Sequence, residues 1–345
     1  MIYLDYAATN PFTKYPCSKY GSFLNPNANY AYKEQKLLDD CANKVKAAIG
    51  AKSGKVVFGG TSSQLIENLM NAISYERLGY EIACSHYDHD SFYKYRDRDI
   101  FNLSDLKFEL DTADDDVKSI VIWQAVQNIT GEIFPTKQIG ELVHKYNGFY
   151  ICDGTAQVGH APIEPNIDDW CDFYCFSGHK ISTELGIGCA WISDRLDNWL
   201  DNFKLYGTPN LAGAMAIADA TEDVCKSSMK HYIELYMHLY HKLVNANIQF
   251  QVISNKVKTC AINAITFDDI NADSLQQYLA SKQIYIGIGG SACSSLHDFR
   301  VLNACGLTND EASHVVRVSF GDETTERDID AFVNVVIDYK EKFVR

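Results

Sequence analysis

The chain has 345 residues, of which 46% are hydrophobic and 22% charged, an ordinary composition for a globular protein with a large core. Its net charge of -14, without any run of lysine or arginine, argues against a nucleic-acid partner. No stretch reaches the roughly 20 apolar residues that span a bilayer, and "MIYLDYAATN" lacks the blocks of a signal peptide. We therefore expect a cytoplasmic protein with no membrane partner.

The eleven cysteines are an odd number and stand without the paired CxxC spacing of a structural zinc site. We therefore expect mostly reduced thiols. Two short runs, "HYDHD" at 86–90 and "HLYH" at 238–241, contain potential metal ligands, but neither has a third ligand at a diagnostic spacing. The sequence thus predicts no metal site.

The first elements of the chain follow a helix, strand, helix pattern. Residues 33–49 place apolar side chains at helical spacing and are followed by Gly50, so they predict an amphipathic helix. A strand at 55–58 leads through the turn "GGTSS" at 59–63 into a helix at 64–73. Such a turn presents backbone N–H groups and hydroxyls that suit a phosphate, although a plain N-cap is the simpler explanation of the turn taken alone.

The centre of the chain alternates buried strands with an amphipathic helix. We expect strands at 119–126, 148–153 and 171–177, and a helix at 136–147. Continuous apolar strands separated by helices are typical of a mostly parallel sheet covered on both faces. Such sheets bind ligands beyond the carboxyl ends of their strands. The sequence therefore predicts an α/β fold with its site at that edge.

The order of the expected helices and strands changes near "YGTPNLAG" at 206–213. The residues after this segment predict a smaller α+β domain. Its expected elements are a helix at 214–246, strands at 259–267 and 284–289 with a helix between them, a strand at 314–320 and a closing helix at 324–343. We expect a large cofactor-binding domain over residues 12–211, and a small domain made of 1–11 and 212–345.

Four polar residues fall at or just past predicted strand ends: Asp153, Ser177, His179 and Lys180. Taken alone, Lys180 is typical of a solvated loop. However, a carboxylate at the end of an apolar strand needs a cationic partner, because burying it unpaired is costly. A pyridinium nitrogen would be such a partner for Asp153. Together with a lysine amine and a phosphate cradle, it describes a pyridoxal phosphate site.

Seven segments, in this order, carry a family resemblance: "IYLDYAATNPF", "HDSF", "VQNITGEIFP", "CDFYCFSGHK", "GTPN", "GSACSS" and "VRVSFGDETTERDID". They resemble the cysteine desulfurases of the class V aminotransferase family. The resemblance implies the fold of type I PLP-dependent transferases, which is a mostly parallel seven-stranded sheet sandwiched by helices, with a smaller α+β C-terminal domain. It also implies pyridoxal 5'-phosphate as cofactor and a homodimer.

The resemblance implies a role for each matching residue. Lys180 would carry the cofactor and move the Cα proton, and Asp153 would keep the ring nitrogen protonated. His89 would stack on the ring and assist the proton transfer as a further catalytic residue. Cys293, in the glycine- and serine-rich "GSACSS", would take the sulfur of the substrate as a persulfide and leave alanine. The other implied contacts are Ser62, Ser63, Ser177, His179 and, from a second subunit, Thr208 for the phosphate; Asn128 and Gln157 for the ring; and Arg317, Asn128 and Ala7 for the substrate.

Arg317 lies inside a predicted strand, where a solvated or salt-bridged arginine is the ordinary explanation. The family places an arginine here to bind the α-carboxylate of the substrate, and the planar guanidinium suits that group.

Two departures from the family pattern leave alternatives open. The glutamine expected three residues after Asp153 is Ala156, with Gln157 one position later, and residues 182–184 read Ser-Thr-Glu where relatives have Tyr-Gly-Pro. An aminotransferase, a β-lyase or a weakly active scaffold would fit these departures. The hypothesis that we carry forward is conversion of L-cysteine to L-alanine, with the sulfur passing from Cys293 to an unidentified acceptor protein.

Overall fold

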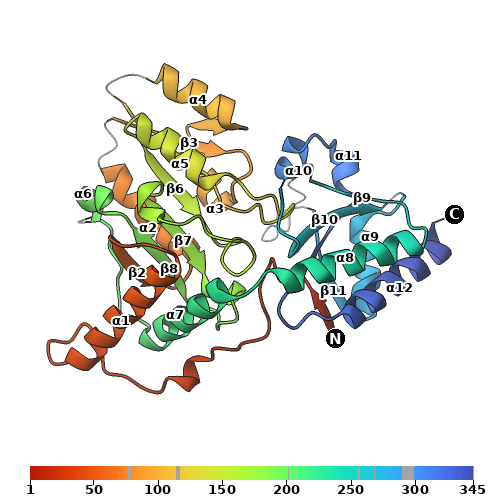
Figure 1. Cartoon of the computed structure of the whole chain (residues 1–345), viewed down its shortest axis with the longest axis horizontal. Coiled ribbons are helices and arrows are strands. Elements are labelled where there is room, and N and C mark those ends of the chain that lie inside the picture. Colours follow the sequence, from red (N-terminus) through yellow and green to blue (C-terminus); the bar gives the residue numbers. More distant parts are fainter. Residues whose placement is uncertain are drawn as a thin grey trace. The chain divides into compact units, whose positions relative to one another are not determined.

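The structure is a computed structural model, and it describes residues 1–345 except 76–78, 114–116, 201, 255–256, 268, 290–298 and 345. The chain forms two compact units (Figure 1). The small unit contains Met1–Asn10, Val126–Ile133 and Ser228–Arg345, and the large unit contains Pro11–Ala125 and Phe134–Ser227.

A seven-stranded sheet forms the centre of the large unit, in the order β2-β8-β7-β6-β5-β3-β4. β8 runs antiparallel to both of its neighbours, and the other pairs are parallel. The strands are β2 (Lys55–Gly59), β3 (Tyr80–Ser85), β4 (Arg98–Ile100), β5 (Lys118–Ile122), β6 (Phe149–Asp153), β7 (Phe173–Ser177) and β8 (Gly188–Ile192). The expected mostly parallel α/β sheet is confirmed.

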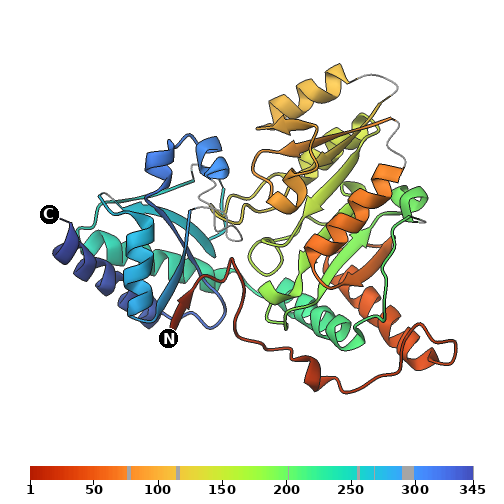
Figure 2. The same ribbon diagram turned by 180° about the vertical axis from the view of Figure 1, so that it is seen from behind.

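Helices cover both faces of this sheet (Figures 1 and 2). They are α1 (Tyr32–Ala48), α2 (Ser62–Tyr75), α3 (Asp90–Tyr93), α4 (Leu103–Thr112), α5 (Thr136–Lys145), α6 (Asp197–Leu200) and α7 (Leu211–Lys226), with 3-10 turns η1 (Cys17–Lys19), η2 (Ile167–Asp169), η3 (Gly178–Lys180) and η4 (Asp194–Leu196). Leu65 and Leu69 of α2 belong to one buried core with Ile120, Ile151 and Phe173. Each such side chain contributes about 1.5–3 kcal/mol by burial, which fixes the N-terminus of α2 against the sheet.

The small unit is built on a five-stranded sheet in the order β1-β11-β12-β10-β9. β1 pairs with β11 in parallel, and the remaining pairs are antiparallel. Its elements are β1 (Ile2–Leu4), β9 (Phe250–Val252), β10 (Ile262–Phe267), β11 (Ile284–Ile288), β12 (Val315–Ser319), α8 (Lys230–Asn245), α9 (Ala272–Ser281), α10 (Arg300–Ala304), α11 (Asn309–Ala312) and α12 (Glu326–Phe343). Among the described residues, no helix is long and apolar enough to cross a bilayer.

The prediction of one helix at 214–246 was wrong, because the structure has two helices there, α7 and α8. Ser227 leaves the helical region with a ψ of 149°, so α7 ends before it and α8 begins at Lys230. Apolar spacing continues across the break, and for that reason the pattern does not reveal it. The predicted strand at 119–126 likewise ends at Ile122.

The division of the chain also differs in detail from the expected large domain at 12–211 and the expected small domain made of 1–11 and 212–345. α7 packs on α1 and therefore belongs to the large unit, which extends to Ser227. The segment Val126–Ile133 belongs to the small unit, although it lies between two stretches of the large one. Asn128 therefore lies in the small unit, with Ala7 and Arg317.

Candidate active site

Asp153 is the last residue of β6 and lies at the carboxyl edge of the large sheet, beside β7. Its side chain is buried, and its Oδ1 accepts a hydrogen bond of 2.8 Å from the backbone N–H of Thr155. The next residue, Gly154, lies so close to the ring of Tyr174 that a Cβ would overlap it. The glycine allows the chain to turn here, and the turn fixes the direction of the carboxylate.

Two buried hydroxyls meet at the N-terminus of α2. The Oγ atoms of Ser62 and Ser177 are 2.7 Å apart, and the backbone N–H of Ser62 donates to Ser177 Oγ at 3.2 Å. A Cβ on Gly188 would lie 2.6 Å from the nitrogen of Ser62, so the glycine lets β8 approach the start of the helix. Hydroxyls and backbone N–H groups at the start of a helix of 14 residues suit a phosphate group.

The predicted partner Ser63 is exposed, unlike Ser62. Thr61 caps the start of α2, since its Oγ1 accepts a hydrogen bond of 3.0 Å from the N–H of Gln64. Thr61 was not among the residues expected at the site, although a threonine three residues before a glutamine is a known helix-start signal.

Lys180 follows β7 in the short turn η3, together with His179. Burial and the neighbouring Lys180 ammonium lower the pKa of His179 to about 4, so this imidazole is neutral at pH 7. After the lysine, Ser182 has a φ of 67°, and its carbonyl accepts hydrogen bonds from the N–H groups of Lys14 and Tyr15. The departure from Tyr-Gly-Pro is thus a loop held by the segment that precedes α1.

His89 is the N-cap of α3, and its Nδ1 accepts a hydrogen bond of 3.2 Å from the N–H of Ser91. A neutral ring therefore carries its proton on Nε2. The preceding Asp88 is fully buried and accepts hydrogen bonds from the N–H groups of Gln124 at 2.6 Å and Ser85 at 3.0 Å. Asp88 joins the ends of β3 and β5 and holds His89 in place. Within the described ranges, no three His, Cys, Asp or Glu residues form a metal-binding group.

Arg317 lies in the central strand β12 of the small unit and is 1% exposed. Its Nη2 and Nε donate to Asp5 Oδ1 at 2.8 and 3.2 Å, and its Nη1 donates to the carbonyl oxygen of Asn128 at 3.0 Å. A guanidinium has five N–H donors, so one on each Nη nitrogen has no acceptor among the described residues. Two such donors can hold a carboxylate.

Arg317 therefore forms the salt bridge that is the ordinary role of a buried arginine, with Asp5 as its partner. It still has N–H donors left for a ligand. Asp5 belongs to the first of the seven segments but was assigned no role, since nothing in the sequence pairs it with a residue 312 positions away. Nearby, the backbone N–H of Ala7 donates to Ser319 Oγ at 2.9 Å, which fixes the chain just after Asp5. Asn128 Oδ1 accepts a hydrogen bond of 3.1 Å from Gln127.

Gln157 has other partners than the cofactor ring. Its Nε2 donates to the carbonyl of Pro162 at 2.7 Å, and its Oε1 accepts from the hydroxyl of Tyr174 at 2.7 Å. Each end of the amide therefore has a protein partner, and the ring contact of Gln157 stays a prediction.

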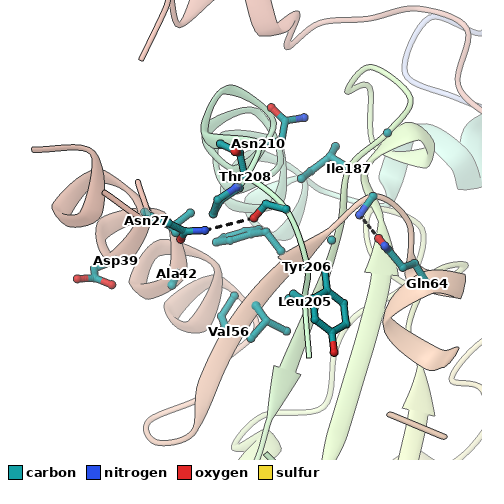
Figure 3. Close-up of a pocket in the computed structure, with 18 residues that line it drawn as sticks. Asn27, Asp39, Ala42, Val56, Gln64, Ile187, Leu205, Tyr206, Thr208 and Asn210 are labelled. Carbon is teal, nitrogen blue, oxygen red and sulfur yellow. Dashed lines mark hydrogen bonds between the residues drawn. The ribbon is translucent and has the colours of Figure 1, made fainter. Parts of the chain in front are cut away.

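Thr208 is exposed and lines a pocket of about 450 Å³ in the large unit (Figure 3). The pocket also contains the glycines that precede α2 and the segment that leads to Thr208, where Asn27 donates to the carbonyl of Gly207 at 3.2 Å. The predicted nucleophile Cys293 lies at 290–298, outside the described residues.

Two buried polar atoms at the carboxyl edge have no hydrogen-bond partner in the part of the chain that the structure describes. They are Nε1 of Trp123, just after β5, and Oγ1 of Thr155, two residues after Asp153. Buried polar groups are normally paired, so a ligand is a reasonable source of these partners. An acid for a ring nitrogen, a hydroxyl pair at a helix N-terminus and a lysine amine fit pyridoxal phosphate.

Comparisons with known proteins show the family and the fold of the chain. The sequence matches the family Aminotransferase class-V over residues 2–207 and 202–332. It is 26% identical to "Cysteine desulfurase IscS" of Klebsiella pneumoniae (strain 342), over 97% of this chain and 91% of that protein. A NifS-like protein from Rickettsia africae ESF-5 has a TM-score of 0.84 at 20% identity, over 99% of both chains. A cysteine desulfurase from Thermococcus onnurineus NA1 has a TM-score of 0.78 at 18% identity, over 99% of this chain and 94% of that one.

Proposed function

The chain belongs to the aminotransferase class-V family, and from this membership we propose that it is a PLP-dependent cysteine desulfurase. It would convert L-cysteine to L-alanine and transfer the sulfur to Cys293. The observation that carries the proposal is the group of polar residues that follow the strands of the large sheet, Asp153, Lys180 and the Ser62–Ser177 hydroxyl pair. This group would form the site for pyridoxal phosphate. The name of the curated relative at 26% identity supports the choice of substrate.

The residues of the large unit would hold the cofactor and move the proton. Ser62 and Ser177, with the N-terminus of α2, would bind the phosphate. Asp153 would accept a hydrogen bond from the protonated ring nitrogen, and His89 would lie against the ring. When bound, the cofactor withdraws electrons from the substrate Cα. Lys180 would take the proton from that carbon and return it later.

The residues of the small unit would bind the substrate and accept the sulfur. The two remaining N–H groups of Arg317 would hold the α-carboxylate of L-cysteine. The thiolate of Cys293 would attack the sulfur of the substrate, so that an S–S bond forms as the Cβ–S bond breaks. The electron pair left on Cβ takes up a proton, which gives the methyl group of alanine. The products are alanine and a persulfide on Cys293.

We also propose a homodimer, in which the pocket beside Thr208 faces a second copy. Tyr206 leaves 90% of its surface exposed and lines this pocket with Leu205. Covering such side chains is favourable, and Thr208 would then reach the phosphate site of the other copy. Sedimentation of the wild type and of Tyr206→Ser tests the interface, and a wild-type monomer would contradict it.

A cytoplasmic location and an unidentified acceptor protein complete the proposal. Ten cysteines among the described residues are free thiols, which is usual in a reducing compartment. A persulfide that remained on Cys293 would block the next turnover, so a further thiol must remove its outer sulfur atom.

The test measures alanine and sulfide released from L-cysteine in the presence of pyridoxal phosphate and a thiol reductant. We expect equimolar products from the wild type and none above background from Cys293→Ala. Cys305→Ala, which removes a partly exposed thiol of the same unit, is the matched control and should behave as the wild type.

Two results would contradict the proposal. Normal alanine release by Cys293→Ala would exclude this cysteine as the sulfur acceptor. Cofactor binding without alanine from the wild type, together with amino-group transfer to a keto acid, would show an aminotransferase instead.

A further inference from the structure

Lys258 is a largely buried lysine of the small unit whose hydrogen bonds to the described residues go to neutral oxygens. Its Nζ donates to the carbonyls of Thr259 at 2.9 Å and Ile262 at 3.2 Å, and to Asn263 Oδ1 at 2.6 Å. The same Nζ lies 4.6 Å from the centre of the Tyr236 ring. Burial lowers the pKa of Lys258 to about 8. Burying an ammonium group without a carboxylate partner costs free energy. The position of Lys258 therefore needs a structural or functional reason.

The acceptors of Lys258 are Thr259, in the turn that precedes β10, and Ile262 and Asn263, the first two residues of β10. This stretch supports the segment Val126–Ile133. The backbones of Lys258 and Glu132 form an antiparallel bridge. On either side of the bridge, Thr259 N–H donates to the carbonyl of Gly131 at 2.9 Å, and Ile133 N–H donates to the carbonyl of Val257 at 2.9 Å. The two segments are therefore joined along their backbones.

Gly131 shows how closely the segments approach. It has a φ of 76°, and a Cβ at this position would overlap the carbonyl oxygen of Ile262. That oxygen is one of the acceptors of Lys258. The lysine thus holds the surface on which Gly131 rests.

Asn128 lies in the same small loop. Bridge pairing of Val126 with Ile133 closes the loop, and Gln127 Oε1 accepts a hydrogen bond of 3.0 Å from Thr130 N–H inside it. On its other side, the carbonyl of Asn128 binds Arg317. The loop is therefore held from two directions, by Arg317 and by the turn that Lys258 organises.

We infer that Lys258 is a positioning residue, which sets the place of Asn128 for the reaction by holding the carbonyls of Thr259 and Ile262. The inference rests on the proposed function, because it assigns Asn128 to the substrate or the cofactor ring. Lys258 itself touches neither.

A double-mutant cycle tests this coupling, with kcat/KM for alanine release as the readout. Lys258→Met keeps most of the length and apolar surface of the side chain but removes its donors. Losing these hydrogen bonds should lower kcat/KM about 10-fold, as expected from roughly 1.4 kcal/mol. In the background of Asn128→Ala, the same change should cost less than about twofold, because coupled residues are not additive.

Lys282→Met is the matched control, because Lys282 also lies over a tyrosine ring of the small unit, at 5.5 Å from the centre of Tyr278. It should leave kcat/KM within about twofold, as expected for a surface change. Additive losses in the cycle would mean that Lys258 acts on stability alone, and they would overturn the inference.

Amide hydrogen exchange of 126–133 gives a second readout that does not depend on catalysis. The N–H groups of Gln127, Gly131 and Ile133 are hydrogen-bonded in the wild type and should exchange faster in Lys258→Met but not in Lys282→Met. Unchanged exchange in this loop would overturn the inference even if the enzyme is a desulfurase. If the wild type makes no alanine but Lys258→Met still exchanges faster in this loop, the proposed function is contradicted. The same result would support the placement of the loop by Lys258.

Discussion

The two units position the polar residues of their sites in different ways. In the large unit, Asp153 and Ser177 end neighbouring parallel strands, and the hydroxyl and N–H of Ser62 lie against Ser177 at the N-terminus of α2. In the small unit, Arg317 lies in the central strand β12, which is antiparallel to both of its neighbours, and it is 1% exposed and paired with Asp5.

The difference shows how topology determines the arrangement of a site. Parallel strands end at one edge, so polar residues that follow them meet there without further devices. An antiparallel sheet has no such common edge, and a charge placed within it needs a partner brought from elsewhere in the chain. We expect the first kind of site to lose function when changed and the second kind to lose stability as well.

The largest effect should come from the large unit, with Lys180→Ala. Removing the group that transfers the Cα proton should lower kcat by at least about 10³-fold, within the range seen for general acid–base residues. Because Lys180 is partly exposed, its removal should leave the melting temperature of the cofactor-free protein nearly unchanged. Calorimetry of the cofactor-free protein, with activity measured beside it, checks both. A large drop in melting temperature would contradict the contrast between the units.

The second effect should come from the small unit, with Asp5→Ala. This change leaves Arg317 buried without its carboxylate and should lower the free energy of unfolding by about 3–5 kcal/mol. Denaturant unfolding measures it. The double variant Asp5→Ala with Arg317→Met is the control, and it should recover much of the loss, because no buried charge remains unpaired. Equal stability of the single and double variants would show that Asp5 stabilises by packing alone.

Two glycines, one in each unit, lie against groups of the two sites. A Cβ on Gly188 would lie 2.6 Å from Ser62 nitrogen, and one on Gly287 would lie 2.7 Å from Asp5 Oδ1. Each alanine variant should cost about 1–3 kcal/mol of stability through overpacking. Gly188→Ala should weaken cofactor binding, whereas Gly287→Ala should raise KM for L-cysteine. Titration of the cofactor and steady-state kinetics separate these outcomes, and an exchange of the two effects would contradict our assignment of the units.

The smallest effect concerns pH and His179. The folded protein keeps this ring neutral down to about pH 4, whereas the unfolded chain takes up a proton near pH 6.5. Between these values the unfolded state binds more protons, so stability falls as the pH drops from 6.5 to 4 and does not depend on this group above 6.5. Melting temperatures of the cofactor-free protein should show a smaller decrease in His179→Asn than in the wild type. Parallel curves would exclude His179 as a source of the acid sensitivity.

Apolar spacing and helix-start signals predicted much of the fold. The helix expected at 33–49 is α1, and the closing helix expected at 324–343 begins after Thr325, which forms a capping box with Asp328. The break between α7 and α8 did not follow, because Ser227 and Ser228 interrupt the backbone without interrupting the apolar period. Local signals thus predict elements better than the joints between them.

The amino-acid sequence alone predicted the parallel sheet, the family resemblance and the position of Asp153, Ser177 and Lys180 after strands. These features depend on neighbours in the chain, and composition and spacing record them. Only the tertiary structure paired Asp5 with Arg317 across 312 positions and directed both ends of the Gln157 amide to protein groups. Such contacts join residues that the fold brings together in space, and no local pattern records which distant groups will share one hydrogen bond.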